Sequence, residues 1–152
     1  MDAVSPPEPL FGDQLARARQ VWVHRMRREL GRLGFDDFRR SDTVVLRSLL
    51  GDPLSIAALA GIIGVTRQAA RKFADGLERR GYVTVMIDRE DARRLRVILS
   101  PAGTAYATAV VEVVALLDGE LARRVDPAQL RAARTVLRTV IGSDVPVTGV
   151  PG

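Results

Sequence analysis

The feature that most constrains this sequence is a pair of short helical patterns joined by a glycine in residues 55–81. In the first pattern, Ala60 is small enough to let a second helix cross closely over it. Gly64 lies between the patterns, where a tight turn needs a left-handed residue. The apolar positions of the two segments are Leu59, Ile63, Val65, Ala70 and Phe73. This arrangement predicts a helix-turn-helix unit.

The second helix of the unit is expected to start after Thr66 and to stop at Gly81, because a hydroxyl residue caps helix N-termini and glycine favours C-termini. Its predicted core side holds Ala70, Phe73, Ala74 and Leu77. The opposite side carries Arg67, Gln68, Arg71 and Lys72. Such side chains contact base edges or phosphates when a helix lies in the DNA major groove. The alternative is the solvated face of an ordinary helix.

A β-hairpin is predicted directly after this helix. Residues 82–88 and 94–99 alternate apolar and polar side chains, as strands with one buried face do. The tip between them is charged and is expected to project into solvent, where Arg93 suits the narrow, negatively charged minor groove. Asp91 is expected to pair with the Arg93 guanidinium and to orient it.

Three segments in this order resemble a known family. They are Leu77-Glu78-Arg79-Arg80-Gly81-Tyr82-Val83, Asp91-Ala92-Arg93 and Val97-Ile98-Leu99-Ser100-Pro101-Ala102-Gly103. Together they are similar to the signature of the MarR family of winged-helix transcriptional regulators. Ser100 stands where the family pattern has threonine, and Ala92 stands where many members have arginine.

The resemblance implies a mainly α fold with a small β wing, in which N- and C-terminal dimerisation helices flank a winged helix-turn-helix. It implies a homodimeric repressor that binds an inverted-repeat operator on double-stranded DNA and is released by a small-molecule effector. The first long helix and the short helix after it would form one wall of the effector pocket. The DNA-binding residues expected on this basis are Ser55, Thr66, Arg67, Gln68, Ala70, Arg71, Lys72, Asp91, Arg93 and Arg94.

The segments on either side of the unit are predicted to be helical. Apolar residues at spacings of three and four predict a long amphipathic helix in residues 11–33, and Ser41 or Asp42 is expected to cap a short helix over residues 43–50. Ser100 and Pro101 begin a helix that is apolar almost all round, so a second copy of the chain is expected to cover it. A last helix is expected to follow Asp126.

The 152 residues fit a single domain, with a DNA-binding lobe at 41–99, dimerisation helices at 10–34 and 101–141, and a flexible tail at 143–152. Residues 1–9 are expected to form a loose arm that is not a signal peptide. The net charge of +5 favours a polyanionic partner. Residues 66–96 hold nine basic and five acidic side chains, a net charge of +4 that gathers near the predicted reading surface.

Several function classes are disfavoured. The chain has no cysteine for a disulfide, and His24 is its only histidine, so no metal or cofactor is expected. The weakly charged run at residues 104–117 is interrupted by Glu112 and is shorter than the roughly 20 apolar residues needed to cross a membrane, which favours a cytoplasmic protein. An enzyme is disfavoured because no nucleophile and base stand at a recognisable spacing. The alternative to a DNA-binding regulator is a winged-helix protein-interaction module, for which Gly76 and Ala92 leave room.

Overall fold

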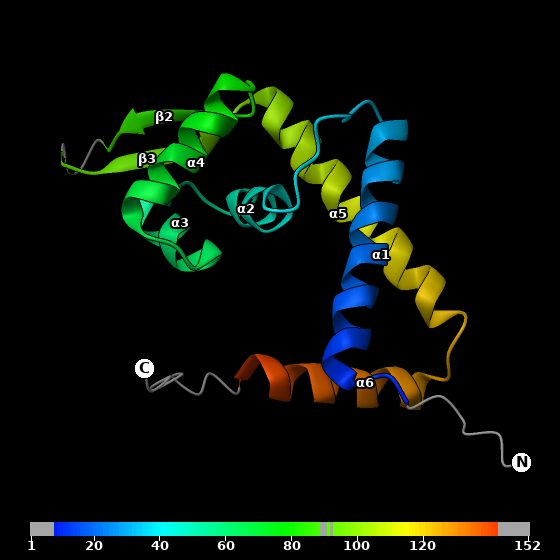
Figure 1. Ribbon diagram of the computed structural model, residues 1–152. Helices are drawn as coiled ribbons and strands as arrows, with labels where there is room; N and C mark the ends of the chain where they lie inside the picture. Colours follow the sequence, from blue (N-terminus) through cyan, green and yellow to red (C-terminus); the bar gives the residue numbers. More distant parts are fainter. Residues whose placement is uncertain (1–7, 89–90, 92, 143–152) are drawn as a thin grey trace, which may run out of the picture. The chain divides into compact units, whose positions relative to one another are not determined.

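The structure, a computed structural model, describes residues 8–88, 91 and 93–142. It divides into two compact units, residues 1–114 and 115–152. The described residues form six α-helices and a three-stranded antiparallel sheet (Figure 1). Most of the predicted arm, part of the wing tip and the whole predicted tail lie outside the described residues.

The first unit contains the helix-turn-helix and the wing. Its helices are α1 (Phe11–Arg32), α2 (Asp42–Leu49), α3 (Ile56–Ile63) and α4 (Arg67–Arg79), and its strands are β1 (Leu54–Ser55), β2 (Val83–Ile87) and β3 (Leu95–Leu99). Helix α5 (Pro101–Ala122) crosses the boundary between the units, and α6 (Pro127–Gly142) belongs to the second. The predicted mainly α fold with a small β wing is confirmed. None of the described helices combines the length and apolar character of a membrane span.

Two hydroxyl side chains and one glycine determine where the helices of the helix-turn-helix begin and end. Ser55 Oγ accepts the backbone N–H of Ala58 at 3.1 Å, and Thr66 Oγ1 accepts that of Ala69 at 3.2 Å. Gly64 ends α3 with a left-handed φ of 68°. The predicted Thr66 cap and the left-handed turn at Gly64 are therefore confirmed.

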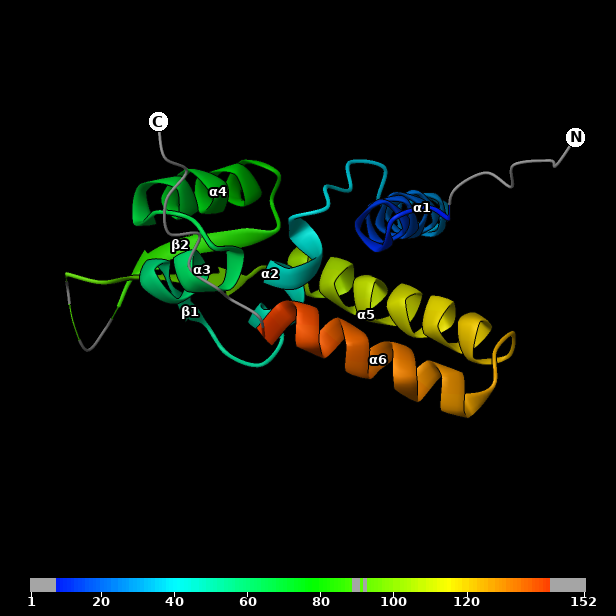
Figure 2. The same ribbon diagram turned by 60° about the horizontal axis from the view of Figure 1, so that its bottom comes forward.

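An apolar core joins α2, α3, α4 and the sheet. Its buried members are Val45, Leu49, Leu59, Ala60, Ala70, Ala74, Leu77, Val83 and Val97. Both α3 and α4 pack against this core, and the β2–β3 hairpin projects past α4 (Figures 1 and 2). The core thereby fixes the start of α4 beside the base of the wing.

The sheet contains one strand that the sequence analysis does not predict. Strand β1 pairs antiparallel with β3, with Leu54 opposite Val97, while β2 pairs with β3 from Val83 opposite Leu99. Because β1 has only two residues, it shows no alternation that a pattern search can detect. Burial along β2 fades from Val83, which is buried, to Ile87, whose exposed fraction is 62%.

The start of α2 differs from the prediction that Ser41 or Asp42 caps it. Ser41 makes no capping hydrogen bond from its side chain, and Asp42 is the first residue of the helix. The carboxylate of Asp42 instead accepts the backbone N–H of Arg39 at 3.0 Å and is fully buried. Contacts with distant residues, described below, account for this burial.

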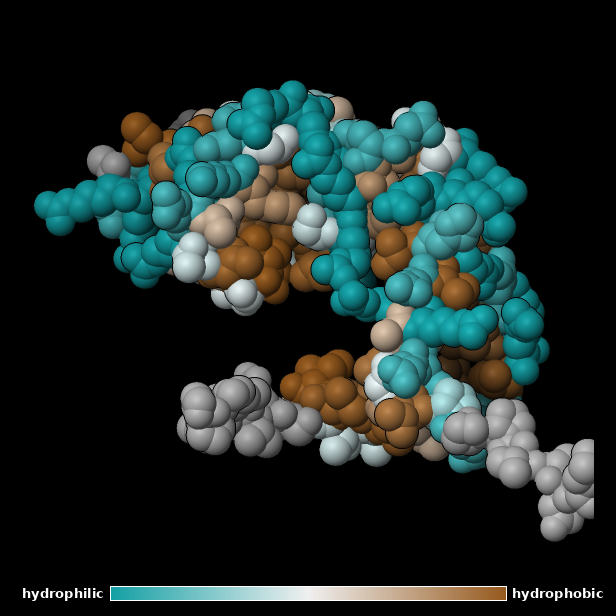
Figure 3. Space-filling view, in the orientation of Figure 1, coloured by the Kyte–Doolittle hydropathy of each residue, from teal (hydrophilic) through white to brown (hydrophobic). Residues whose placement is uncertain are grey.

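The second unit contains α6, which begins directly after Asp126, as predicted. Asp126 Oδ1 accepts the Ala128 N–H at 2.7 Å, and Gln129 Oε1 accepts the Asp126 N–H at 3.1 Å, which makes a reciprocal capping box. No residue of α6 is buried. Its exposed apolar residues, visible as brown surface in Figure 3, are Val136, Leu137, Val140 and Ile141.

Candidate nucleic-acid interface

An open groove lies between the first turns of α3 and α4 and the base of the wing. Its volume is about 670 Å³. The lining residues are Ser55, Ile56, Ala57, Arg67, Gln68, Arg71, Arg93, Arg94 and Leu95. Four of these are arginines and none is acidic, so the groove is positively charged. Figure 3 shows hydrophilic side chains gathered at the wing end of the first unit.

The groove brings together six of the predicted DNA-binding residues, which are Ser55, Arg67, Gln68, Arg71, Arg93 and Arg94. The prediction missed three lining residues, which are Leu95 at the start of β3 and Ile56 and Ala57, the first residues of α3. Ile56 and Ala57 contribute their backbone, since the N-terminal turn of a helix carries partial positive charge and N–H groups that favour an anion. The Ser55 cap was the signal in the sequence that marked this helix end.

The Arg71 side chain, which lines the groove, is held by an ion pair with Asp75 on the same helix. Its Nε lies 2.8 Å from Asp75 Oδ1, one helical turn further along α4. An exposed pair of this spacing contributes only about 0.5 kcal/mol to helix stability. Its larger effect is geometric, because the hydrogen bond holds one edge of the guanidinium and leaves the terminal nitrogens for a ligand.

The wing differs from the prediction in the partner of Asp91. The Asp91 carboxylate pairs with Arg94, whose Nε lies 3.1 Å from Oδ2, and it accepts only the backbone N–H of Arg93, at 3.0 Å. The predicted pairing with the Arg93 guanidinium is therefore wrong. The Arg94 backbone N–H donates to the Asp91 carbonyl and closes a turn. This turn brings Arg94, rather than Arg93, next to the Asp91 carboxylate.

Arg93 consequently keeps its guanidinium for a ligand. It makes no ion pair within residues 8–88, 91 and 93–142, and it is exposed beside the groove. The base of the wing is stiffened separately by Arg96, whose Nε lies 2.7 Å from Asp88 Oδ2. A fixed wing base, with an arginine near its end that pairs with no acidic residue in the described part of the chain, suits a groove that receives a polyanion.

Four predicted residues do not line the groove, namely Asp91, described above, and Thr66, Ala70 and Lys72. Ala70 is fully buried in the core and presents no side-chain surface to the groove. It lies between Arg67 and Arg71 in sequence, but the helical repeat turns it inward. The Thr66 hydroxyl is used in capping α4. Lys72 is exposed beyond the edge of the groove.

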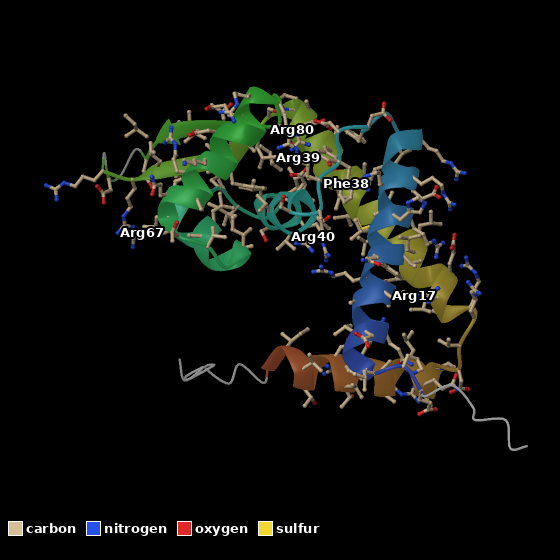
Figure 4. All side chains as sticks on the ribbon, in the orientation of Figure 1. Arg17, Phe38, Arg39, Arg40, Arg67 and Arg80 are labelled. Carbon is tan, nitrogen blue, oxygen red and sulfur yellow. The ribbon has the colours of Figure 1, made fainter. Side chains whose placement is uncertain are left out.

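The opposite end of α4 carries a partly buried ionic cluster that the sequence did not predict, with Asp42 and Tyr106 fully buried and Asp37 exposed. Arg80 donates from Nε to Asp37 Oδ2 at 2.7 Å, and from Nη1 and Nη2 to the two oxygens of Asp42 at 3.2 and 2.9 Å. Tyr82 donates to Asp37 at 2.8 Å, and Tyr106 donates to Asp42 at 3.2 Å. Figure 4 shows Arg80 near Arg39 at this end of the lobe and Arg67 at the other.

Electrostatics and burial shift the pKa values of this cluster. The hydrogen bond from Arg80 lowers the pKa of Asp37. Burial raises the pKa of Tyr82 to about 12, and burial also raises the pKa of Tyr106. Burial opposes the charge on Arg80, but its hydrogen bonds to Asp42 and Asp37 outweigh this effect and raise its pKa. The cluster therefore holds a charged arginine between two carboxylates.

The described residues include no group of three or more histidine, cysteine, aspartate or glutamate side chains arranged to hold a metal ion. The groove offers guanidinium and helix N–H groups, which only donate hydrogen bonds, and the Gln68 amide, which both donates and accepts. Such a set binds anions by charge-assisted hydrogen bonds.

Comparison with solved structures identifies the fold. The chain is 21% identical to BpsR of Bordetella bronchiseptica, whose DNA binding is regulated by 6-hydroxynicotinic acid, with 93% of this chain and 100% of that one covered and a TM-score of 0.73. It is 16% identical to MepR of S. aureus in a DNA complex, with coverages of 90% and 99% and a TM-score of 0.77. It is 20% identical to MarR of E. coli in its apo form, with coverages of 88% and 98% and a TM-score of 0.65.

No protein-family model and no curated protein sequence matches the chain. The structural likeness covers nearly the whole length of these regulators, so the chain has their winged-helix fold with its flanking helices.

Proposed function

We propose that the protein is a homodimeric, sequence-specific DNA-binding transcriptional regulator of the MarR family. The observation that carries this proposal is the groove in which arginines of the helix-turn-helix and of the wing meet with no acidic side chain among them. Four guanidinium groups on one concave face supply more positive charge than a single small anion needs, which favours a polyanion such as a nucleic acid. The DNA complex of MepR and the regulated DNA binding of BpsR support the same function for this fold.

Each part of the groove has an expected role. Arg67 and Gln68 occupy the first turn of α4, the part of a recognition helix that meets base edges, where arginine suits guanine and glutamine suits adenine. Arg93 is expected in the adjacent minor groove. Arg94 and the first turn of α3 are expected to contact phosphates, which fix register without reading sequence.

The homodimer is supported by apolar surface on the flanking helices. Helix α6 has no buried residue and exposes four apolar side chains at positions 136, 137, 140 and 141, which fall on one helical face. Helix α5 exposes Val111, Leu116 and Leu121. A second copy of the chain would cover this surface, and a two-fold dimer would require an inverted repeat with half-sites about 10 bp apart.

Release by a small molecule, repression of transcription and a cytoplasmic location are further parts of the proposal. The regulation of BpsR by 6-hydroxynicotinic acid supports effector control in a protein of this fold. The effector of this chain is expected to differ, because the two chains share only 21% identity.

The deciding experiment is selection of bound sequences from a random duplex library, followed by affinity measurements on the selected duplex. We expect an inverted repeat and sedimentation of a dimer on one duplex. Gln68→Ala should relax preference at one position of each half-site by about 1–3 kcal/mol. Arg94→Gln should weaken binding to all sequences alike. Weak binding without sequence preference by the wild type would contradict the proposal and favour a protein-interaction module.

A further inference from the structure

The cluster around Arg80 joins segments that are far apart in the sequence. Arg80 follows the last residue of α4, Asp37 lies in the loop before α2, and Asp42 begins α2. Tyr106 is a residue of α5. All of these residues belong to the first unit. The cluster therefore ties the end of the recognition helix to α2 and to α5.

The hydrogen bonds of the cluster are directional and complete. Arg80 uses all three guanidinium nitrogens, and the Asp42 carboxylate accepts from Arg80, from Tyr106 and from the backbone of Arg39. Within the part of the chain that the structure describes, no buried side-chain nitrogen or oxygen lacks a partner. A planar guanidinium that meets a carboxylate with two parallel hydrogen bonds permits little rotation.

Aromatic packing encloses the same group. The Tyr106 ring stacks on Phe35 with centroids 4.7 Å apart and tilts against Tyr82 at 4.6 Å, while the Arg80 guanidinium lies 5.0 Å from the Tyr82 ring centre. The exposed fraction of the Arg80 side chain is 13%, and that of Asp42 is zero. A change in the angle of α4 would pull Arg80 away and leave the Asp42 charge buried without its partner, which is strongly unfavourable.

The same angle sets the position of the groove residues. Helix α4 has 13 residues, so its first and last residues lie about 18 Å apart along the axis. A tilt of about 10° at the Arg80 end would therefore move Arg67 by about 3 Å. A displacement of that size breaks a hydrogen bond to a base edge.

We propose that Arg80 is a positioning residue for the DNA-binding groove: its bonds to Asp42 and Asp37 fix the angle of α4 against α5. The effect on DNA rests on the proposed function, whereas the angle is a property of the protein alone. A buried ion pair of this kind contributes less to stability than to a unique arrangement of the elements that it joins.

The first test measures the angle without DNA. Because the chain has no cysteine, Lys72→Cys on α4 and Thr108→Cys on α5 are specific attachment points for nitroxide labels. Excess unlabelled protein restricts the measured spin pairs to those within one chain. We expect a narrow distance distribution in the parent and a broad one in Arg80→Met.

Two further variants control this test for loss of folding and for loss of charge. Arg80→Met paired with Asp42→Asn removes the buried charge together with its partner, so it tests the angle even if the single variant fails to fold. Arg79→Met removes the same charge from the exposed neighbouring position and should keep the narrow distribution. A distribution in the folded double variant as narrow as that of the parent would overturn the proposal.

The second test uses the selected duplex. In the double variant we expect affinity to fall about tenfold, which is within the range for residues remote from a ligand. The salt dependence should stay unchanged, because every groove arginine is still present. Titration with excess duplex measures the fraction of each protein that can bind DNA. Affinities are compared at equal concentrations of this fraction, so partial unfolding is not counted as weaker binding. An unchanged affinity beside a broadened distance would refute the link to the groove. A wild type that reads no sequence, with the distance still broadened, would refute the proposed function but not the positioning of α4.

Discussion

Neutralising Arg93 tests whether the groove, rather than the overall charge, binds DNA. Each chain contributes four groove arginines, and a dimer would present eight. If each arginine displaces one counterion from the DNA, whether it contacts a phosphate or lies against a base edge in a groove, the logarithm of affinity falls against the logarithm of salt concentration with a slope of about −7. Arg93→Gln removes one arginine from each protomer and reduces the expected slope to about −5.

The change in slope predicts a large difference in salt sensitivity. Between about 50 and about 200 mM salt, wild-type affinity should fall about 20,000-fold, whereas that of Arg93→Gln should fall about 2,000-fold. Fluorescence anisotropy of a labelled duplex across this range measures both slopes. The affinity of each protein at one salt concentration is divided by its own affinity at another, so differences in active fraction between the proteins cancel.

The matched control is Arg27→Gln. Arg27 is exposed on α1 and does not line the groove, so its loss changes the net charge by the same amount as the loss of Arg93. We expect Arg27→Gln to retain the wild-type slope. Equal slopes for all three proteins, or an equal reduction in both variants, would refute the argument that DNA binds in the groove through these arginines.

Further predictions concern the supports of the groove. Gly103→Ala should destabilise the protein by about 3 kcal/mol, because the new Cβ would collide with the Tyr82 carbonyl. The same change at Gly76 should stabilise α4 by about 1 kcal/mol, since its Cβ would meet only the end of a flexible side chain at 3.8 Å; urea unfolding measures both. Asp75→Asn should lower the ratio of specific to non-specific DNA affinity about twofold, because Arg71 loses its brace. Tyrosinate absorbance should rise near pH 12 rather than pH 10, since both tyrosines of the chain belong to this partly buried cluster and the pKa of Tyr82 is about 12. The folded-state pKa is the raised one, so the associated stability is present below pH 10 and is lost as pH rises toward 12; Tyr82→Phe should reduce that loss in alkaline unfolding measurements.

Local sequence signals predicted most of the helices and their ends. The caps at Thr66 and Asp126 and the left-handed Gly64 act on residues within four positions, so a short window contains the whole interaction. Apolar periodicity likewise predicted which side of α4 is buried. The groove followed because Arg67, Gln68 and Arg71 share the opposite side of the same helix.

The sequence was less informative where one range of residues contains both faces of a helix, or where a turn selects among similar side chains. Ala70 falls within the range of α4 that the family resemblance assigned to DNA, but it is fully buried on the core side that apolar periodicity had predicted for it. Asp91 pairs with Arg94 because a turn in the wing selects among neighbouring arginines of equal chemistry. Sequence spacing alone does not distinguish these arginines.

The sequence by itself determined the helical segments, the hairpin and the arginine-rich face of α4, since each depends on short-range periodicity, capping or charge. Only the tertiary structure decided that β1 completes the sheet and that Asp42 is buried beside Arg80 and Tyr106. These partners are 38 and 64 residues from Asp42, and no local pattern encodes such a pairing. The physical reason is that a buried carboxylate needs donors from several elements at once, and only the packed chain brings those elements together.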